Sequence, residues 1–79
     1  ENAAILIDIG AAVEIYMDGR RIDVRQVKAN VIRLIAENPQ GSVVIQADVK
    51  STAEKIVAVM DEVREAGVVD ISIASEPNF

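Results

Sequence analysis

The chain has 79 residues, so it holds one small domain at most, and a domain of this size buries only about 60–65% of its unfolded surface. Hydrophobic residues make up 51% of the chain, which excludes disorder by composition, and only Tyr16 and Phe79 are aromatic, so the core must be aliphatic. The net charge of −5 argues against electrostatically driven binding to nucleic acid or anionic lipid, and the lack of cysteine and histidine removes disulfides, thiolate metal sites and the commonest general base.

The start of the chain predicts three strands. Apolar residues alternate over positions 4–9 and again over 13–17, which is typical of half-buried strands. Asp18-Gly19 predicts a tight hairpin turn, because a turn of this kind needs positive φ. Residues 20–22 then form a short third strand.

A first helix is expected after the third strand. Asp23 is in position to cap it, and Gln26 follows three residues later, as in a capping box. The Asn-Pro-Gln-Gly stretch at 38–41 ends the helix and turns the chain. The predicted apolar stripe of this helix consists of Val24, Val27, Val31, Leu34 and Ile35.

The second half predicts a strand over 43–47 and a last strand over 69–74 that Pro77 ends, since apolar residues alternate in both. Residues 48–50 carry the turn after the first of these strands. We expect a second helix between the strands.

Ser51 and Glu54 form the predicted capping box of that second helix, and Gly67 stands where a left-handed cap ends it, because only glycine takes that conformation without a steric cost. Its predicted apolar stripe consists of Ala53, Ile56, Val57, Met60 and Val63.

This order of elements predicts an α+β fold. Each helix links two strands that can lie parallel, and such crossovers are right-handed in nearly all known cases. The apolar side chains of the strands lie mainly on one face. We therefore expect a two-layer sandwich, a mixed β-sheet of about five strands with two helices packed on one face. The other face is expected to carry Leu6, Glu14, Tyr16, Val44, Gln46, Asp70 and Ser72.

The sequence offers no machinery for catalysis, so we expect no enzyme, no catalytic residue, no metal site and no cofactor. The serines have no histidine partner, and the glycines form no phosphate-binding loop. Asp48 follows a strand end, where functional residues are common, but it also suits support of the turn. Asp61 and Glu65 can share a helix face, although like charges at that spacing usually face water, and the same holds for Glu62.

Two features favour an interaction module. Arg20, Arg21 and Arg25 cluster around Asp23, and they serve either as a docking site for an acidic partner or anionic polymer or as local balance for nearby carboxylates. In addition, a small sheet has two edges, and an unprotected edge recruits another strand. The segments 4–9, 43–47 and 69–74 have few charges and no proline to protect them, and one of them is expected to lie at an edge.

The second half resembles the C-terminal part of the ExbD/TolR family. The resemblance is close over 43–77 and looser over 4–39, where it is mostly pattern. The matching residues are Ala47-Asp48, Val59-Met60-Asp61, Ala66-Gly67, the alternating strand after them and Pro77. The resemblance implies that 1–79 is a single periplasmic domain of an inner-membrane single-span protein, whose transmembrane helix and linker lie outside this fragment.

The resemblance also implies a function. Family members look like subunits of a proton-motive-force-driven motor that work with an ExbB/TolQ-type membrane subunit to support transport across the outer membrane. The domain would form a homodimer and contact a TonB- or TolA-type protein, or peptidoglycan in TolR-like members. The unprotected sheet edge favours β-strand addition as the way in which it binds such a partner. The acidic charge favours the ExbD side. The candidate partner-binding residues are Tyr16, Val44, Gln46, Asp48 and Asp61.

One alternative stays open from the residues alone. An ACT-like domain that senses a small molecule is also a two-layer α+β module. Such domains usually order their elements strand-helix-strand-strand-helix-strand, whereas here two or three strands precede the first helix.

Overall fold

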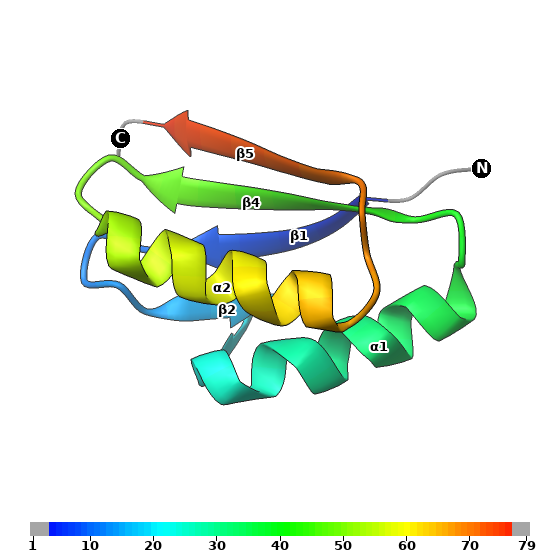
Figure 1. Ribbon diagram of the computed structural model, residues 1–79. Coiled ribbons are helices and arrows are strands. Elements are labelled where there is room, and N and C mark those ends of the chain that lie inside the picture. The colour runs from blue at the N-terminus through cyan, green and yellow to red at the C-terminus, as the bar shows by residue number, and fades with distance from the viewer. Residues whose placement is uncertain (1–3, 77–79) are drawn as a thin grey trace.

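The computed structural model describes residues 4–76 and contains a five-stranded sheet and two α-helices. Both helices lie on the same face of the sheet (Figure 1), so the expected α+β sandwich is confirmed. The elements are β1 (Ala4–Ile9), β2 (Ile15–Met17), β3 (Arg20–Ile22), the 3₁₀ turn η1 (Val24–Gln26), α1 (Val27–Glu37), β4 (Ser42–Asp48), α2 (Ala53–Glu65) and β5 (Ile71–Glu76).

The sheet has the order β3-β2-β1-β4-β5, with β1 in the middle. β1 is antiparallel to β2 and parallel to β4, so Ile7 lies between Met17 and Ile45. All three side chains are buried on the helix-facing side. The alternation of side chains along a strand therefore sends every second residue of β1, β2 and β4 into the core.

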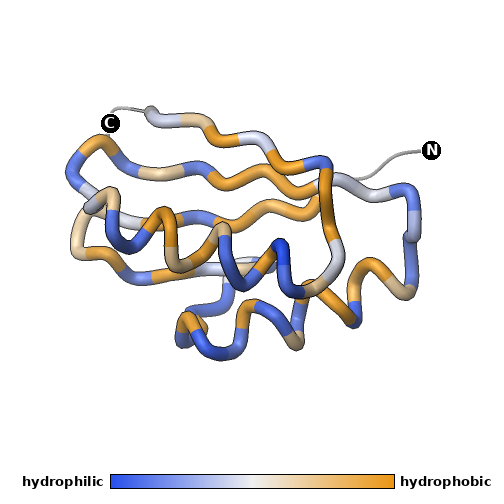
Figure 2. The backbone as a smooth tube through the Cα atoms, viewed as in Figure 1, coloured by the Kyte–Doolittle hydropathy of each residue, from blue (hydrophilic) through white to orange (hydrophobic). Residues whose placement is uncertain are grey.

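The core is aliphatic, as composition predicts. Figure 2 shows hydrophobic stretches on β1 and β4 and alternating hydrophobic positions on β5, whereas the helices alternate between hydrophobic and hydrophilic segments. Among residues 4–75 no polar or charged residue is buried. The buried residues are Ile7, Ile9, Ile15, Met17, Val27, Val31, Val43, Ile45, Ala47, Val59, Val63 and Val68.

The hairpin between β2 and β3 forms as predicted. Asp18 and Gly19 both have positive φ, 54° and 72°, which is the geometry that a two-residue turn between twisted strands requires. Gly67, with φ of 95°, takes the left-handed conformation expected after α2.

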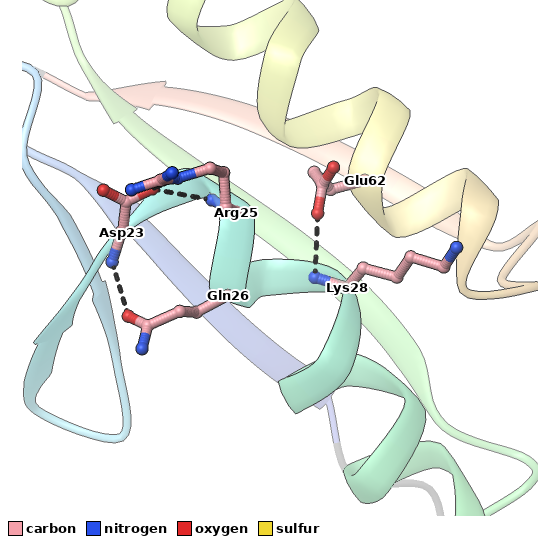
Figure 3. Close-up of polar contacts among 5 residues, drawn as sticks. All are labelled: Asp23, Arg25, Gln26, Lys28 and Glu62. Carbon is pink, nitrogen blue, oxygen red and sulfur yellow. Dashed lines mark hydrogen bonds and ion pairs between the residues drawn. The ribbon is translucent and has the colours of Figure 1, made fainter.

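Asp23 caps as predicted, but the helix after it begins later than expected. The Asp23 carboxylate accepts from the backbone N–H of Arg25, and the Gln26 side chain accepts from the N–H of Asp23 at 2.9 Å (Figure 3). The capping box thus closes the short turn η1, and α1 starts at Val27.

The predicted cap of α2 is wrong by one residue. Thr52, not Ser51, is the N-cap, and its Oγ1 accepts from the N–H of Lys55 at 3.1 Å. The reason lies in the preceding turn, where the N–H of Ser51 donates to the carbonyl of Asp48 at 2.9 Å. Because this turn holds Ser51, its Oγ is buried, and within residues 4–76 it has no hydrogen-bond partner.

The predicted stripe of α2 is also partly wrong. Val59 and Val63 are buried and Ile56 and Met60 are partly buried, which is the spacing i, i+3, i+4, i+7. Val57, predicted to face the core, is 54% exposed, and Ala53 is exposed too. Valine stands at both 57 and 59, so composition did not distinguish the two positions.

Two strands begin two residues later than predicted. Val13 has φ of 57° inside a turn in which Gly10 N–H donates to the carbonyl of Glu14, so β2 starts at Ile15. Val68 inserts into the core after Gly67 and leaves Val69 96% exposed, so β5 starts at Ile71. Pro77, predicted to end this strand, lies outside the described residues.

Candidate interaction surfaces

Within residues 4–76, one long edge of the sheet has no neighbouring strand, and it belongs to β5. The N–H of Val43 donates to the carbonyl of Asp70 at 3.0 Å, so Asp70 faces β4. Successive residues of a strand direct their backbone groups to opposite sides. Ser72 and Ala74 therefore also bond to β4, whereas Ile71, Ile73 and Ser75 direct their N–H and C=O groups away from the sheet.

An apolar side chain accompanies this edge. Ile73 is paired with the fully buried Ile45 and lies on the helix-facing side, yet it is 49% exposed. Figure 1 shows the reason, since the helices lie against the other strands and β5 forms the far side of the sheet. A strand added to β5 would therefore gain hydrogen bonds and cover Ile73. Sequence reasoning did not single out Ile73, because it stands at an apolar position of the alternating pattern, and such a position predicts a buried side chain.

The expectation that one of three unprotected segments lies at an edge is confirmed by β5. The other two segments are interior, since β1 lies between β2 and β4, and β4 lies between β1 and β5. The second edge is β3, which is three residues long and begins with Arg20 and Arg21. The two edges thus differ in length and in chemistry.

Four of the five candidate partner-binding residues lie on the face of the sheet without helices. Tyr16 pairs with Asp8, and Asp8 pairs with Gln46, so these three form one row across the sheet. Val44 and Asp48 lie on the same face because they are two residues from Gln46 along β4. Asp61 does not join them, because it is exposed on α2, the helix on the opposite face.

The neighbours of Tyr16 and Asp48 give both side chains a local structural contact. The Tyr16 hydroxyl donates to Glu14 Oε2 at 3.4 Å, while Glu14 Oε1 accepts from the N–H of Ala12 at 3.0 Å. Asp48 Oδ1 accepts from the N–H of Lys50 at 2.9 Å. This hydrogen bond supports the turn after β4, which is one of the two roles considered for Asp48.

A small apolar strip lies on the same open face. Leu6 is 47% exposed and is paired with the half-buried Val44. The neighbouring positions are polar, with Asp8 and Gln46 in the next row and Ser72 beside Val44. The apolar strip is therefore narrow. The edge of β5, with its outward backbone groups and the exposed Ile73, is the larger candidate surface.

The carboxylates of α2 do not form a dyad. Glu65 lies 3.6 Å from the ammonium of Lys28, whereas Asp61 is exposed. Glu62, expected to be merely solvated, is half-buried and accepts from the backbone N–H of Lys28 at 3.2 Å (Figure 3). The expectation for Glu62 was wrong, because the packing of α2 against α1 brings the start of one helix next to the end of the other.

Electrostatic perturbation is found at one surface pair. The pKa of Asp23 is lowered, first because its carboxylate accepts from the backbone N–H of Arg25 and then because it accepts from the guanidinium. The same carboxylate raises the pKa of Arg25, with Arg25 Nε 3.2 Å from Asp23 Oδ1. This pair holds the turn η1 in place and balances one arginine of the basic cluster.

Comparisons with known proteins agree with the architecture. The family model described as biopolymer transport protein ExbD/TolR matches residues 1–78. The chain is 41% identical over 76 residues to the biopolymer transport protein exbD2 of Vibrio cholerae serotype O1, and the match covers 96% of this chain and 57% of that protein. The match extends through the first half, where the resemblance rested mostly on pattern.

Proposed function

The chain belongs to the ExbD/TolR family of biopolymer transport proteins, and we propose that it is the periplasmic domain of an inner-membrane motor subunit that supports transport across the outer membrane. In this proposal an ExbB/TolQ-type subunit supplies proton-driven movement. Neither helix within residues 4–76 is long and apolar enough to cross a membrane. The chain spans 57% of the length of its relative, and we assign the membrane anchor to the remainder.

The role of this domain in the proposal is to hold a TonB- or TolA-type partner by β-strand addition at β5. The observation that carries it is the open edge, where Ile71, Ile73 and Ser75 direct their backbone groups outward. Each backbone hydrogen bond adds about 0.5–1.5 kcal/mol net, and covering Ile73 adds a hydrophobic contribution. A row of such bonds along a strand resists pulling, which suits the transfer of motor movement.

Homodimerisation uses the same feature in this proposal. Two copies related by a two-fold axis can join their β5 edges into one continuous sheet, because an isologous contact pairs the same patch on both subunits. A second copy and a partner segment then compete for β5. Peptidoglycan is a weaker candidate ligand, because a domain with a net charge of −5 repels an anionic glycan, and this favours the ExbD subgroup over TolR.

The ACT-like alternative has no observation in its favour. The element order is three strands, helix, strand, helix, strand, and it does not follow the order of such domains. We therefore propose no small-molecule ligand.

The test is a titration of the ¹⁵N-labelled domain with a peptide covering the juxtamembrane segment of the TonB- or TolA-type partner. We expect the largest amide shifts at Ile71, Ile73 and Ser75, together with slower hydrogen exchange of these amides. The substitution Ile73→Lys should weaken binding about tenfold by removing apolar contact and adding an edge charge.

Val57→Lys is the matched control, because Val57 is 54% exposed and Ile73 49% exposed, but Val57 lies on α2. It should leave the affinity unchanged. Shifts confined to the helices, or equal losses from both substitutions, would reject strand addition at β5.

A further inference from the structure

A groove runs along β3, the second edge of the sheet. A hollow of about 250 Å³ lies between β3 and α1, and Arg20, Arg21, Asn30 and Arg33 are among the residues that line it. A second hollow of about 390 Å³ shares Arg21, Ile22 and Gln26 with the first and extends to Lys55 near the start of α2. The two hollows adjoin at these shared residues, and we call them together the β3 groove.

Positive charge is concentrated in this groove. Four of the eight lysines and arginines line it in a chain with a net charge of −5, namely Arg20, Arg21, Arg33 and Lys55. Because Arg21 pairs with Tyr16, its side chain starts on the face of the sheet without helices, so the charge of the groove comes mainly from the other three. Three different elements contribute them, namely β3, α1 and α2. The fold therefore brings together cations that lie up to 35 positions apart in the sequence (55 − 20).

Within residues 4–76, none of these cations forms an ion pair with a carboxylate beside it. The ion pairs found within residues 4–76 are Arg25–Asp23 and Lys28–Glu65, and neither includes a cation of the groove. Arg33 donates to the neutral amide oxygen of Asn30 at 3.1 Å, and the Asn30 amide in turn donates to the carbonyl of Gln26 at 2.8 Å. Asn30 thus orients the guanidinium and leaves its charge uncompensated.

Three acidic residues border the groove, and one of them is paired with a cation outside it, since Asp23 lies 3.2 Å from Arg25. Glu14 keeps its charge, because its hydrogen-bond donors, the N–H of Ala12 and the Tyr16 hydroxyl, are neutral. Asp18 lies in the hairpin turn at one end. Arg20, Arg33 and Lys55 outnumber Glu14 and Asp18, so the remaining balance of charge in the groove is positive.

The β3 edge also presents the backbone N–H and C=O groups of one residue to this groove. In a two-residue hairpin the residues that flank the turn, here Met17 and Arg20, form a hydrogen-bonded pair. The next residue, Arg21, pairs with Tyr16 without backbone bonds and directs its own N–H and C=O away from β2. A donor and an acceptor therefore lie among the positive side chains.

We propose that the β3 groove docks an extended acidic segment of a partner protein, with carboxylates against Arg20, Arg33 and Lys55 and its backbone against Arg21. The outward N–H and C=O groups of Arg21 favour a polypeptide, which can pair with both, over a polysaccharide. This interface is separate from the apolar β5 edge and goes beyond the function proposed above. Edge protection alone explains charges on β3 itself, but it requires neither the groove nor the cations from two helices.

The test uses the 79-residue chain and the peptide acetyl-(Glu-Val)₄-amide, which alternates acidic and strand-forming residues. Acetyl-(Gln-Val)₄-amide is the uncharged control, and a polyuronate such as alginate is the polysaccharide arm. Nuclear magnetic resonance shifts of the Arg21 amide and of the arginine Nε–H groups report binding. We expect the acidic peptide to shift these signals, with an affinity that falls as salt rises.

The variant Arg20→Gln/Arg33→Gln should lower the affinity for the acidic peptide about tenfold, since it removes two charge-assisted contacts. Lys50→Gln/Arg64→Gln changes the net charge by the same amount outside the groove and should have little effect. Equal loss from both variants, shifts centred on β5, or binding of alginate without the peptide would overturn the proposal. So would a lack of peptide binding by the parent chain together with self-association of the Arg20→Gln/Arg33→Gln variant, since the arginines would then only protect the edge.

Discussion

The carboxylate of Glu62 in α2 accepts a hydrogen bond from the backbone N–H of Lys28 in the first turn of α1, with a distance of 3.2 Å. The first N–H groups of a helix have no partner within that helix, and a negative charge there also interacts favourably with the helix dipole. The side chain of Lys28 lies 3.6 Å from Glu65, one turn further along α2. Two residues of α2, Glu62 and Glu65, therefore hold the start of α1 against α2.

Removing this contact should destabilise the domain. We expect Glu62→Ala to lower the free energy of unfolding by about 1 kcal/mol, as for loss of a helix cap. Urea denaturation followed by circular dichroism measures this change. Asp61→Ala on the same helix is the control, because Asp61 is exposed, and its effect should stay within about 0.5 kcal/mol. Equal effects of the two substitutions would mean that the Glu62–Lys28 contact contributes nothing.

The two hydroxyl residues before α2 should respond differently to substitution by alanine. Thr52→Ala removes the cap and should cost about 1 kcal/mol of unfolding free energy. Ser51→Ala should be neutral or stabilising, because it removes a buried Oγ that has no partner within residues 4–76. Thermal unfolding of both variants tests this order. A larger loss for Ser51→Ala than for Thr52→Ala would contradict the assigned cap.

Val13 should be replaceable with a gain in stability. It is β-branched and has φ of 57°, a conformation that asparagine tolerates better. We expect Val13→Asn to raise the free energy of unfolding by about 0.5–1 kcal/mol through relief of backbone strain. Val49→Asn, an exposed turn position, should change it by less than about 0.5 kcal/mol. Chemical denaturation of both variants is the measurement, and a loss for Val13→Asn would show that its apolar contacts outweigh the strain.

The contribution of Asp23 should depend on pH. Its pKa is lowered in the folded state, so its stabilising effect is present above the unfolded value of about 3.9 and is lost as the pH falls through the folded value. The substitution Asp23→Asn keeps a capping oxygen at this position but removes the charge. Wild type should therefore be more stable than this variant near neutral pH, and the difference should vanish in acid. Urea denaturation of both proteins across this pH range is the measurement, and a difference that is constant with pH would show that the charge of Asp23 plays no part.

Local signals in the sequence predicted local structure well. Asp18 and Gly19 have positive φ because a two-residue hairpin turn requires it, and Gly67 has positive φ because it ends α2 with a left-handed cap. Asp23 and Gln26 form the capping box. The boundary of α2 was missed by one residue because Ser51 and Thr52 can both cap, and the hydrogen bond from Ser51 to Asp48 decided between them.

The candidate surfaces were only partly predictable. Alternation along β4 correctly grouped Val44 and Gln46 on one face, whereas Asp48, expected in the turn, is the last residue of the strand and lies on the same face. Their part in partner binding stays a prediction. Asp61 could not be separated from them by spacing alone, since the face that a helix residue occupies depends on how the helix packs. The exposure of Ile73 depends on which strand lies at the edge, and strand order is a property of the whole sheet.

The sequence by itself excluded disulfides and cysteine or histidine ligands, and it determined the α+β pattern, the turns and the aliphatic composition of the core, because these follow from residue type and short-range spacing. Only the tertiary structure decided that β5 and β3 are the edges, that Glu62 lies against Lys28, and that Arg33 and Lys55 flank the β3 groove. The physical reason is that edges, helix contacts and grooves arise between segments distant in the chain, and pairing across the sheet sets their positions.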